Sequence, residues 1–498
     1  MADHAVGRSP PRVLGAVLLR SENVLTHPMT RPATRHARMR LTCSALLAGL
    51  AVAPMWAWGA EAQFEGSYRA RGRLFDTLTL DRTLGERSEA MSAYLEHRLW
   101  LRPRFLVSDD VTLNVDFLGL NNVVWGNQPV TYDEYIDNPP PTFDTDLSAP
   151  TSSTDESAPL RDFTLWRAWG DVNTPVGRFK VGRMPLHWGA GMLLNDGIHV
   201  NPHYADFGDT ADRFQWEILV RDQFIVQAAA ELQSEGFVND PDEKVDDRAA
   251  YSFVTAYRSE DVTGGILLRI DRAPTFGFTQ FTADGAVDAT LGKLHGEVEV
   301  AGQFGSGDLI NGVNDASIAR LGAVLNADLD IDPWILGVQA GLATGDGKED
   351  LGFRTFTFDR DYSIGLMMFE QSMPVLAATA PNDVNKGRSY EAVLTGNAVS
   401  NALFLKPRLR RRIIEGLEAE VSWLGARVAK VPERIGDRRS YGMEVGAGLH
   451  YLGVEHLDVA LQGALFLPGS YYSNYNDGTL STFDDSAFGA QLSTRLHF

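Results

Sequence analysis

The sequence predicts an all-β fold, a transmembrane antiparallel β-barrel of about 18 strands, with 16 strands as the alternative. Three observations predict it: apolar and polar residues alternate in many segments, long and short connections alternate between those segments, and the last segment alternates up to Phe498. Apart from 41–58, no segment offers the roughly 18 consecutive apolar residues of a transmembrane helix. A mean hydropathy of −0.16 fits a barrel, because only every second strand residue faces lipid.

The first 62 residues are interpreted as an N-terminal extension followed by a secretory signal peptide. A basic region at 35–40 precedes the apolar stretch 41–58, and Ala60-Glu61-Ala62 follows it, which is the order found in such signals. We expect cleavage after Ala62 and a barrel domain over 63–498. Cys43 is the only cysteine, so the mature chain would contain none, which suits an oxidising envelope compartment.

The strands are predicted from runs rich in Val, Leu, Phe, Tyr and Trp with a period of two. Their predicted ranges are 64–80, 90–107, 110–125, 161–173, 176–187, 213–221, 223–235, 248–259, 261–271, 276–288, 292–305, 316–329, 333–345, 397–410, 415–428, 440–452, 456–467 and 486–498.

The lengths of the connections support this strand count. With both termini of the mature chain in the periplasm, connections after odd-numbered strands should be long and those after even-numbered strands tight. The long connections all follow odd-numbered strands: 126–160, 188–212, 236–247, 346–396 and 468–485. The tight ones follow even-numbered strands: 174–175, 221–222, 260–261, 330–332 and 453–455. Only 272–275 is short where a longer connection is expected.

Alternation along the strands gives rows of basic residues a common face. An Arg or Lys near the middle of the lipid face would cost about 2–4 kcal/mol, so these rows should face the lumen or lie near a rim. The pore-lining candidates are Arg69, Arg71, Arg73, Arg98, Trp100, Arg102, Arg104, Lys406, Arg408 and Arg410.

Two interpretations of these basic rows remain open. They could pair with acidic residues on inward faces and stiffen a water-filled barrel; the acidic candidates are Glu217, Glu231, Glu297, Glu299, Glu418 and Glu420. Alternatively, they could form an electropositive track for anionic solutes such as an acidic polysaccharide, because Arg binds carboxylate or phosphate as a bidentate fork.

The segment 179–197 predicts a break at the top of a strand. Gly182 and Gly189 allow a bend, and Pro185 blocks ladder pairing. We therefore expect the chain to fold inward here as a constriction loop, with candidates Arg183, His187, Trp188, Asn195, Asp196 and His199. A metal site built from His187, His199 and His203 is an alternative, but their spacing matches no known tight site. No metal and no cofactor are predicted.

Acidic residues are concentrated in the expected loops 137–156, 240–247, 346–350 and 484–485, and the net charge is −20. These clusters indicate solubility and mutual repulsion of exposed loops, or a cation site such as Ca²⁺ shared with lipopolysaccharide at the outer surface. The expected partners are outer-membrane lipid and lipopolysaccharide, and no nucleic acid is expected.

The last strand, which ends in an aromatic residue, resembles the closing strand of Gram-negative outer-membrane barrels. That resemblance implies a location in the bacterial outer membrane and makes Phe498 a signal for the outer-membrane assembly machinery. The run Gly182-Arg183-Met184-Pro185 with Trp188-Gly189 and Gly191 resembles a signature of several such families, including alginate-export-type barrels. The stretches 401–407 and 466–469 resemble the same export type. The full run 182–197 is similar to an uncharacterised outer-membrane family of deltaproteobacteria and myxobacteria.

These resemblances imply an 18-stranded barrel that transports solutes, or exports an anionic polymer, across the outer membrane. They do not transfer a substrate. A structural or adhesive barrel without transport is the main alternative, and a membrane-embedded hydrolase is a further one. No enzyme is predicted, because the sequence contains no Gly-x-Ser-x-Gly elbow.

Overall fold

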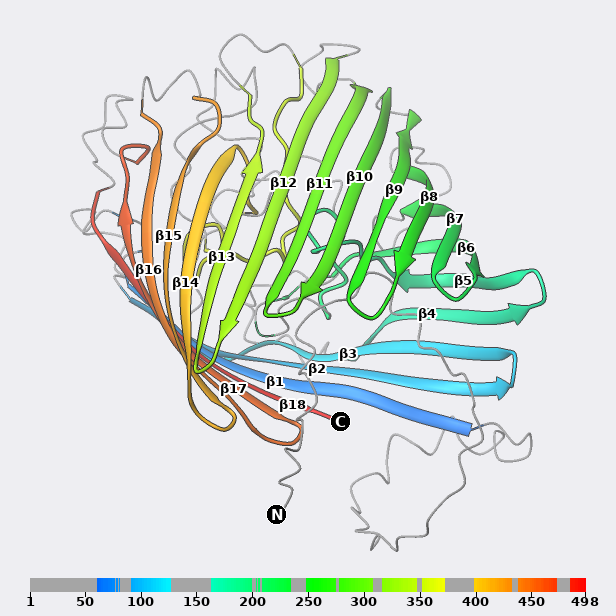
Figure 1. The fold of residues 1–498 in the computed structure, drawn as a ribbon, viewed down its shortest axis with the longest axis horizontal. Helices are drawn as coiled ribbons and strands as arrows, with labels where there is room; N and C mark the ends of the chain where they lie inside the picture. The colour runs from blue at the N-terminus through cyan, green and yellow to red at the C-terminus, as the bar shows by residue number, and fades with distance from the viewer. Residues whose placement is uncertain are drawn as a thin grey trace, which may run out of the picture.

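The chain forms a closed antiparallel β-barrel in a computed structural model (Figure 1). The structure describes residues 61–76, 78, 80, 91–126, 163–198, 203, 205–206, 208–233, 248–274, 277–307, 316–346, 352–371, 398–431, 438–472 and 484–498. Its 18 strands pair with their sequence neighbours, and β1 pairs with β18 to close the sheet. The predicted strand number and fold class are therefore confirmed, and the 16-stranded alternative is excluded.

The strand bounds follow the predicted ranges closely. The strands are β1 Glu61–Asp76, β2 Met91–Ser108, β3 Val111–Gly126, β4 Phe163–Thr174, β5 Gly177–Pro185, β6 Thr210–Val220, β7 Phe224–Gln233, β8 Arg248–Arg258, β9 Val262–Ala273, β10 Phe278–Leu291, β11 Leu294–Gly307, β12 Ala316–Ile331, β13 Trp334–Ala343, β14 Ala402–Ile414, β15 Leu417–Val428, β16 Ser440–Val454, β17 Leu457–Pro468 and β18 Ala487–His497.

The tight turns lie where the sequence predicts them. Between β6 and β7, Arg221 and Asp222 have φ values of 53° and 57°, the left-handed conformation that two-residue hairpin turns favour. The β9–β10 connection is also short, as its sequence indicates, although it lies at the end of the barrel where the other connections are long.

Two strand boundaries differ from the prediction because segments turn into the barrel. The strand predicted at 64–80 ends at Asp76, since the chain then turns inward and buries Leu78 and Leu80. The strand predicted at 397–410 begins only at Ala402, because Ser400 bridges to Thr357 of another inward segment.

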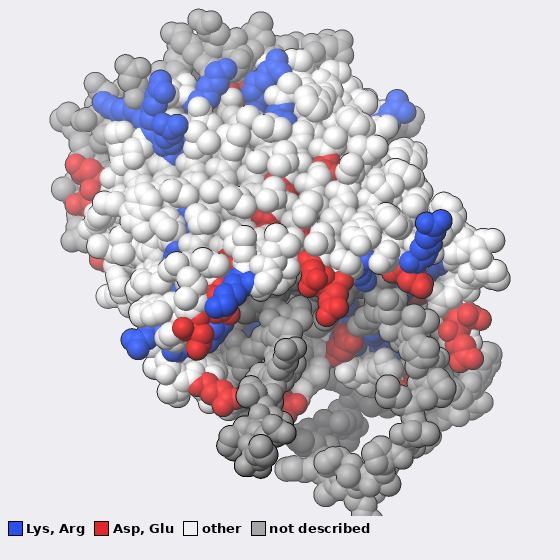
Figure 2. Space-filling model, viewed as in Figure 1, with Lys and Arg blue, Asp and Glu red and all other residues white. Residues whose placement is uncertain are grey.

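The outer wall is apolar, as a lipid-facing surface should be. Val421, Leu461 and Leu492 are each about half exposed, and Figure 2 shows the wall in view as largely free of charged side chains between the two ends of the barrel. No described helix is long and apolar enough to cross a membrane.

The seam between the first and last strands involves the terminal residue. Gly66 N donates to Phe498 O at 2.9 Å, and Phe498 N donates to Gly66 O at 3.0 Å. Phe498 therefore helps to close the barrel, whereas its role as an assembly signal stays a prediction. The predicted signal peptide also stays a prediction: residues 1–60 lie outside the described residues, and Glu61 and Ala62 belong to β1.

The core of the protein lies inside the barrel. Phe404, Leu424 and Phe466 project inward from β14, β15 and β17 and are buried against the segment 352–371, including Phe358 and Met367. This segment and the earlier segment 186–198 both run through the lumen, so the described lumen is partly filled by chain.

Candidate functional site

A basic wall lines the lumen along β1 and β2. Alternation puts Arg69, Arg71 and Arg73 on the inner face of β1, and Arg98 on the inner face of the adjacent β2. All four are less than 10% exposed, because segments from other parts of the chain cover them. The structure therefore brings together four of the predicted pore-lining arginines, and the candidate Trp100 lies beside two of them, Arg69 and Arg98.

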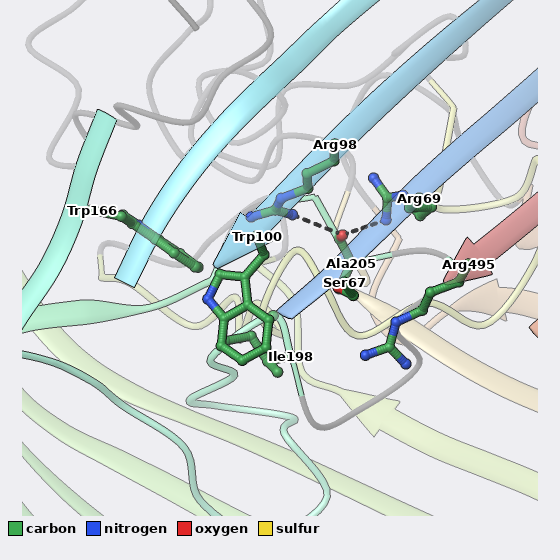
Figure 3. A pocket seen from close by; sticks show the side chains of 9 residues that line it. Ser67, Arg69, Arg98, Trp100, Trp166, Ile198, Ala205 and Arg495 are labelled. Carbon is green, nitrogen blue, oxygen red and sulfur yellow. Dashed lines mark hydrogen bonds between the residues drawn. The ribbon is translucent and has the colours of Figure 1, made fainter. Parts of the chain in front are cut away.

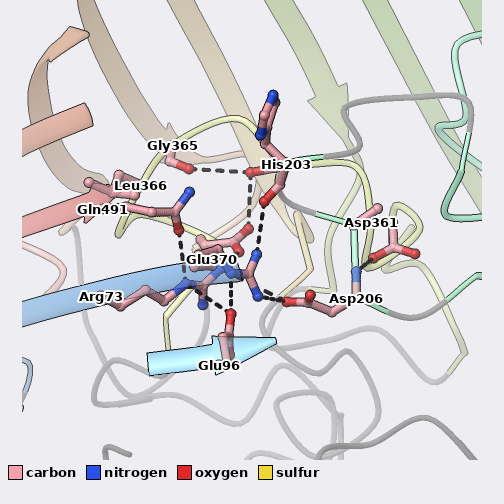
Figure 4. Close-up of polar contacts among 12 residues, drawn as sticks. Arg73, Glu96, His203, Asp206, Asp361, Gly365, Leu366, Glu370 and Gln491 are labelled. Carbon is pink, nitrogen blue, oxygen red and sulfur yellow. Dashed lines mark hydrogen bonds and ion pairs between the residues drawn. The ribbon is translucent and has the colours of Figure 1, made fainter. Parts of the chain in front are cut away.

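Three carboxylates contact this basic wall (Figure 4). Asp206, between the inward segment 186–198 and β6, binds Arg69 and also binds Arg71 with its second oxygen at 2.5 Å. Glu96, opposite Arg71 in the β1–β2 register, binds Arg71 and lies 3.5 Å from Arg73. Glu370, from the second inward segment, lies 3.5 Å from Arg73. Much of the wall's positive charge is thus paired.

The two loop carboxylates respond differently to this environment. Burial raises the pKa of Asp206, but Arg71 and Arg69 lower it by more, so its pKa lies below the usual range and the group is charged. Burial raises the pKa of Glu370 to about 7, because the opposing effect of Arg73 offsets only part of the desolvation. Glu370 therefore titrates near neutral pH.

A pocket beside these ion pairs is lined by guanidinium groups (Figure 3). Its described lining contains three arginines and no carboxylate: Ser67, Arg69, Arg98, Trp100, Trp166, Gly197, Ile198, Ala205 and Arg495. Arg69 and Arg98 both donate to the carbonyl oxygen of Ala205, at 2.7 and 3.0 Å. The Arg98 guanidinium also lies 5.4 Å from the ring centre of Trp166. The pocket offers an anion several N–H donors beside apolar rings.

Arg102, below this pocket, is held by a carboxylate and two indoles. It forms a bidentate pair with Asp116 at 2.5 and 2.8 Å, and its guanidinium lies 4.8 Å from the ring of Trp100 and 5.2 Å from that of Trp169. Its charge is therefore engaged within the wall. Arg104, the last candidate on β2, lies 3.6 Å from Glu65.

The three β14 candidates lie elsewhere in the barrel. Arg408 and Arg410 both bind Asp328 of β12, at 3.0 and 2.7 Å. Lys406 donates to the carbonyl oxygen of Ile364 at 2.7 Å. As the sequence indicates, the candidates of strands 1, 2 and 14 are not all neighbours, and the β14 group belongs to a paired network.

The predicted constriction motif does fold inward after β5. Gly189 and Gly191 have φ values of 55° and 77°, and a Cβ on Gly189 would come within 2.6 Å of Glu299 Oε2, so glycine is needed there. Glu299 on β11 accepts hydrogen bonds from Met192 N and Leu193 N at 3.1 and 3.2 Å. The carboxyl group of Glu299 therefore holds the tip of this segment.

Polar residues of the same segment stabilise its turn. Asn195 Oδ1 accepts from Gly197 N at 3.1 Å, and Asp196 Oδ1 accepts from Ile198 N at 3.0 Å. Arg167 of β4 donates to the Asp196 carbonyl oxygen at 2.9 Å. His187 Nδ1 lies 4.0 Å from Asp196 Oδ1. The hydrogen bonds of Asn195, Asp196 and Arg167 thus fix the backbone of this segment.

Solved structures share this fold. OccK9 (OpdG) of Pseudomonas aeruginosa aligns with a TM-score of 0.50 at 11% identity, over 88% of this chain and 99% of that chain. OpdQ of the same organism aligns with a TM-score of 0.48 at 10% identity, over 88% of this chain and 98% of that chain. The chain has the fold of an outer-membrane barrel. At these identities the likeness concerns the fold alone.

The predicted bacterial outer-membrane location agrees with that fold and with the apolar outer wall. No family model and no curated protein matches the sequence. The resemblances to alginate-export-type barrels and to the myxobacterial family therefore stay predictions, as does the expectation that the protein is no enzyme.

Two constriction candidates, Arg183 and Trp188, do not face the open lumen. Arg183 points outward from β5, because it shares a face with the exposed Val181 and pairs with Asp212 at 2.9 Å. Trp188 packs against the inner wall near Ile225 and Leu267. His199 lies outside the described residues. The proposed histidine metal site cannot be assembled from described residues alone, and among those residues no group of three or more His, Cys, Asp or Glu could hold a metal ion.

Sequence reasoning missed the second inward segment, 352–371, which was expected only as part of an outer loop. Glu444 on β16 accepts hydrogen bonds from three of its backbone N–H groups, those of Leu366, Met367 and Met368, at 2.7, 3.1 and 2.8 Å. The two inward segments also meet, because Asp359 N donates to Met192 O at 2.7 Å. Asp206, just before β6, also contacts the second segment, since its N donates to Asp361 Oδ1 at 2.7 Å.

Several site residues could have been found from strand parity. Glu96 and Arg495 share the inward faces of their strands with Arg98 and Gln491, which alternation alone indicates. Asp206 and Glu370 carried no such signal, because they lie on segments whose path depends on tertiary contacts.

Proposed function

We propose that this chain is an outer-membrane channel for small anionic solutes, and that the guanidinium pocket is a point where such solutes bind. The observation that carries the proposal is the lining of that pocket: among its described residues, Arg69, Arg98 and Arg495 contribute to it and no carboxylate does. A narrow lumen with low-dielectric walls strengthens the local field, and loop charges farther than about 8 Å away are screened at physiological salt.

The two interpretations of the basic rows apply to different parts of the wall. On β14, Arg408 and Arg410 pair with Asp328. On β2, Arg102 pairs with Asp116, so these cations stabilise the wall. On β1 and β2, Arg69 and Arg98 line the pocket, although Arg69 also pairs with Asp206. We infer that anion preference arises there, although the net charge of the chain is −20.

Small solutes suit this lumen better than a polymer. The segments 186–198 and 352–371 are fixed by Glu299 and Glu444 and contact each other inside the barrel. Export of an anionic polysaccharide, which the resemblance to alginate-export-type barrels implies, would require both segments to move.

Reversal potentials in planar bilayers test this proposal. We expect the wild-type channel to prefer anions, and the double variant R69Q/R98Q to shift the reversal potential toward cation preference. R183Q is the matched control, because it removes one positive charge from the outer face of the same barrel. High salt should reduce the difference, since it screens the field.

Two results would contradict the proposal: a cation-selective wild-type channel, or a double variant whose selectivity equals that of the wild type. Either would mean that the arginines serve only as paired wall residues. Absence of any conductance from the refolded barrel would favour the structural or adhesive alternative.

A further inference from the structure

The extracellular rim of β14–β16 carries basic residues on its outer side. Arg427 lies opposite Leu403 of β14 and Ser440 of β16, at the end of the barrel away from the tight β14–β15 turn. It shares the outward face of β15 with Val421 and Trp423. Arg427 therefore stands at the upper edge of the lipid-facing wall.

Arg439 lies beside Arg427 at the start of the next strand. Val428 N donates to Arg439 O at 2.8 Å, so the two backbones are adjacent. Both arginines are exposed, as is Lys430 two residues past β15. Among the described residues, no hydrogen bond or ion pair involves the side chain of Arg427 or Arg439, in contrast to the paired arginines of the lumen.

An apolar surface lies directly below these cations. Leu405, Val421 and Val445 are each 46–54% exposed on the outer faces of β14, β15 and β16. Trp423 adds an indole whose Nε1 donates to Met443 Sδ at 3.4 Å. At about 3.3 Å per residue, Trp423 lies roughly 13 Å below Arg427, within reach of a lipid whose headgroup sits at the rim.

The opposite end of the same wall has a different charge pattern. There Arg412 pairs with Asp330 at 2.6 Å, and Arg411 lies over the ring of Trp334 at 5.0 Å. Figure 2 shows basic side chains prevailing along the upper edge and both signs of charge along the lower edge. Among the described residues of this wall, Arg427 and Arg439 therefore differ from Arg412, whose charge is paired with a carboxylate.

We propose that Arg427 and Arg439, together with Lys430, bind the phosphate groups of a phosphorylated glycolipid of the outer leaflet, whose acyl chains lie along Leu405, Val421 and Trp423. Guanidinium binds phosphate directly and bidentately, so this contact needs no bridging divalent cation. It is independent of solute passage, because these side chains lie outside the lumen.

Native mass spectrometry of the full barrel in detergent with EDTA tests the contact, using bisphosphorylated lipid A and its phosphate-free counterpart as probes. We expect wild type to retain the phosphorylated lipid and R427Q/R439Q to bind it about 25-fold more weakly, since each cation near an anionic headgroup contributes about fivefold. The charge-preserving R427K/R439K should bind with intermediate affinity, because an ammonium keeps the charge but not the bidentate contact. R411Q, at the other end of the same wall, is the matched control and should bind like wild type.

Equal binding of both lipids to wild type, or equal affinity of R427Q/R439Q and wild type, would overturn the proposal. So would retention that appears only when Mg²⁺ is supplied, because that result would assign the contact to acidic loops bridged by cations. Unchanged channel selectivity in R427Q/R439Q keeps this test separate from that of the proposed function.

Discussion

The basic wall of β1–β2 and the facing walls at β11 and β16 use charge in different ways. On β1 and β2, arginine side chains bind side-chain carboxylates and the backbone carbonyls of His203 and Ala205, and Arg69 and Arg98 line a pocket. On β11 and β16, Glu299 and Glu444 accept backbone N–H groups of the inward segments. We propose that the first wall binds solutes, whereas the second binds the backbone of the chain itself.

We infer that the carboxyl groups of β11 and β16 position the inward segments, whereas the arginines of β1 and β2 determine ion selectivity. The carboxylates at Glu299 and Glu444 are less than 6% exposed and have their oxygens taken by two or three N–H donors. Removing either should change the shape of the lumen. Removing charges on the β1–β2 wall should instead change which ions pass, with the segments still in place.

The largest effect is expected for E444A. Hydrogen bonds to a charged group contribute about 1.5–3 kcal/mol each, and this change removes the acceptor of three N–H groups. The segment 352–371 should loosen, single-channel conductance should rise and proteolysis within the segment should become faster. E420Q, on the inner face of the neighbouring β15, is the control. Unchanged conductance and proteolysis in E444A would show that the segment is held by its apolar contacts alone.

D206N should have a smaller effect, on selectivity rather than on conductance. It removes the carboxylate shared by Arg69 and Arg71 and adds one net positive charge beside the pocket. Two unit charges about 8 Å apart interact by roughly 2 kcal/mol at an effective dielectric of 20, and screening reduces this. We expect the anion-to-cation permeability ratio to rise about fivefold, as measured by reversal potentials.

D212N provides the matched control for that experiment, because Asp212 pairs with Arg183 on the outer face. A ratio that rises equally in both variants would mean that the overall charge of the barrel, rather than the pocket, sets selectivity.

The contrast between the walls also explains what the sequence could predict. Period-two alternation and loop-length parity identify all 18 strands, because each strand's pattern is local. The inward Arg69, Arg71 and Arg98 follow from the same rule. The partners Asp206 and Glu370 do not, because the paths of their segments are set by Glu299, Glu444 and the apolar lumen.

One signal of the second inward segment was nevertheless present. Phe404, Leu424 and Phe466 have the parity of lumen-facing residues but are apolar, which a water-filled barrel would not favour. Such inward apolar residues on neighbouring strands indicate that chain, rather than water, fills that part of the lumen.

The smallest predicted effect concerns pH and Glu370. Because the pKa of Glu370 is raised to about 7, lowering the pH from about 8 to about 6 should protonate it and remove one negative charge beside Arg73. The groups facing Glu370 are Arg73, Arg71, Asp206 and Ser363, and the low pKa of Asp206 keeps it charged across this range. Burial also lowers the pKa of His203 to about 4, so His203 stays neutral between pH 8 and pH 6.

Anion preference should therefore increase modestly as the pH falls, by less than in D206N, because Glu96 remains near Arg73. E370Q should show the low-pH selectivity at every pH in this range. If E370Q kept the full pH dependence in reversal-potential measurements, another titrating group would be responsible. Protonation of Glu370 beside Arg73 would then not control the ion selectivity.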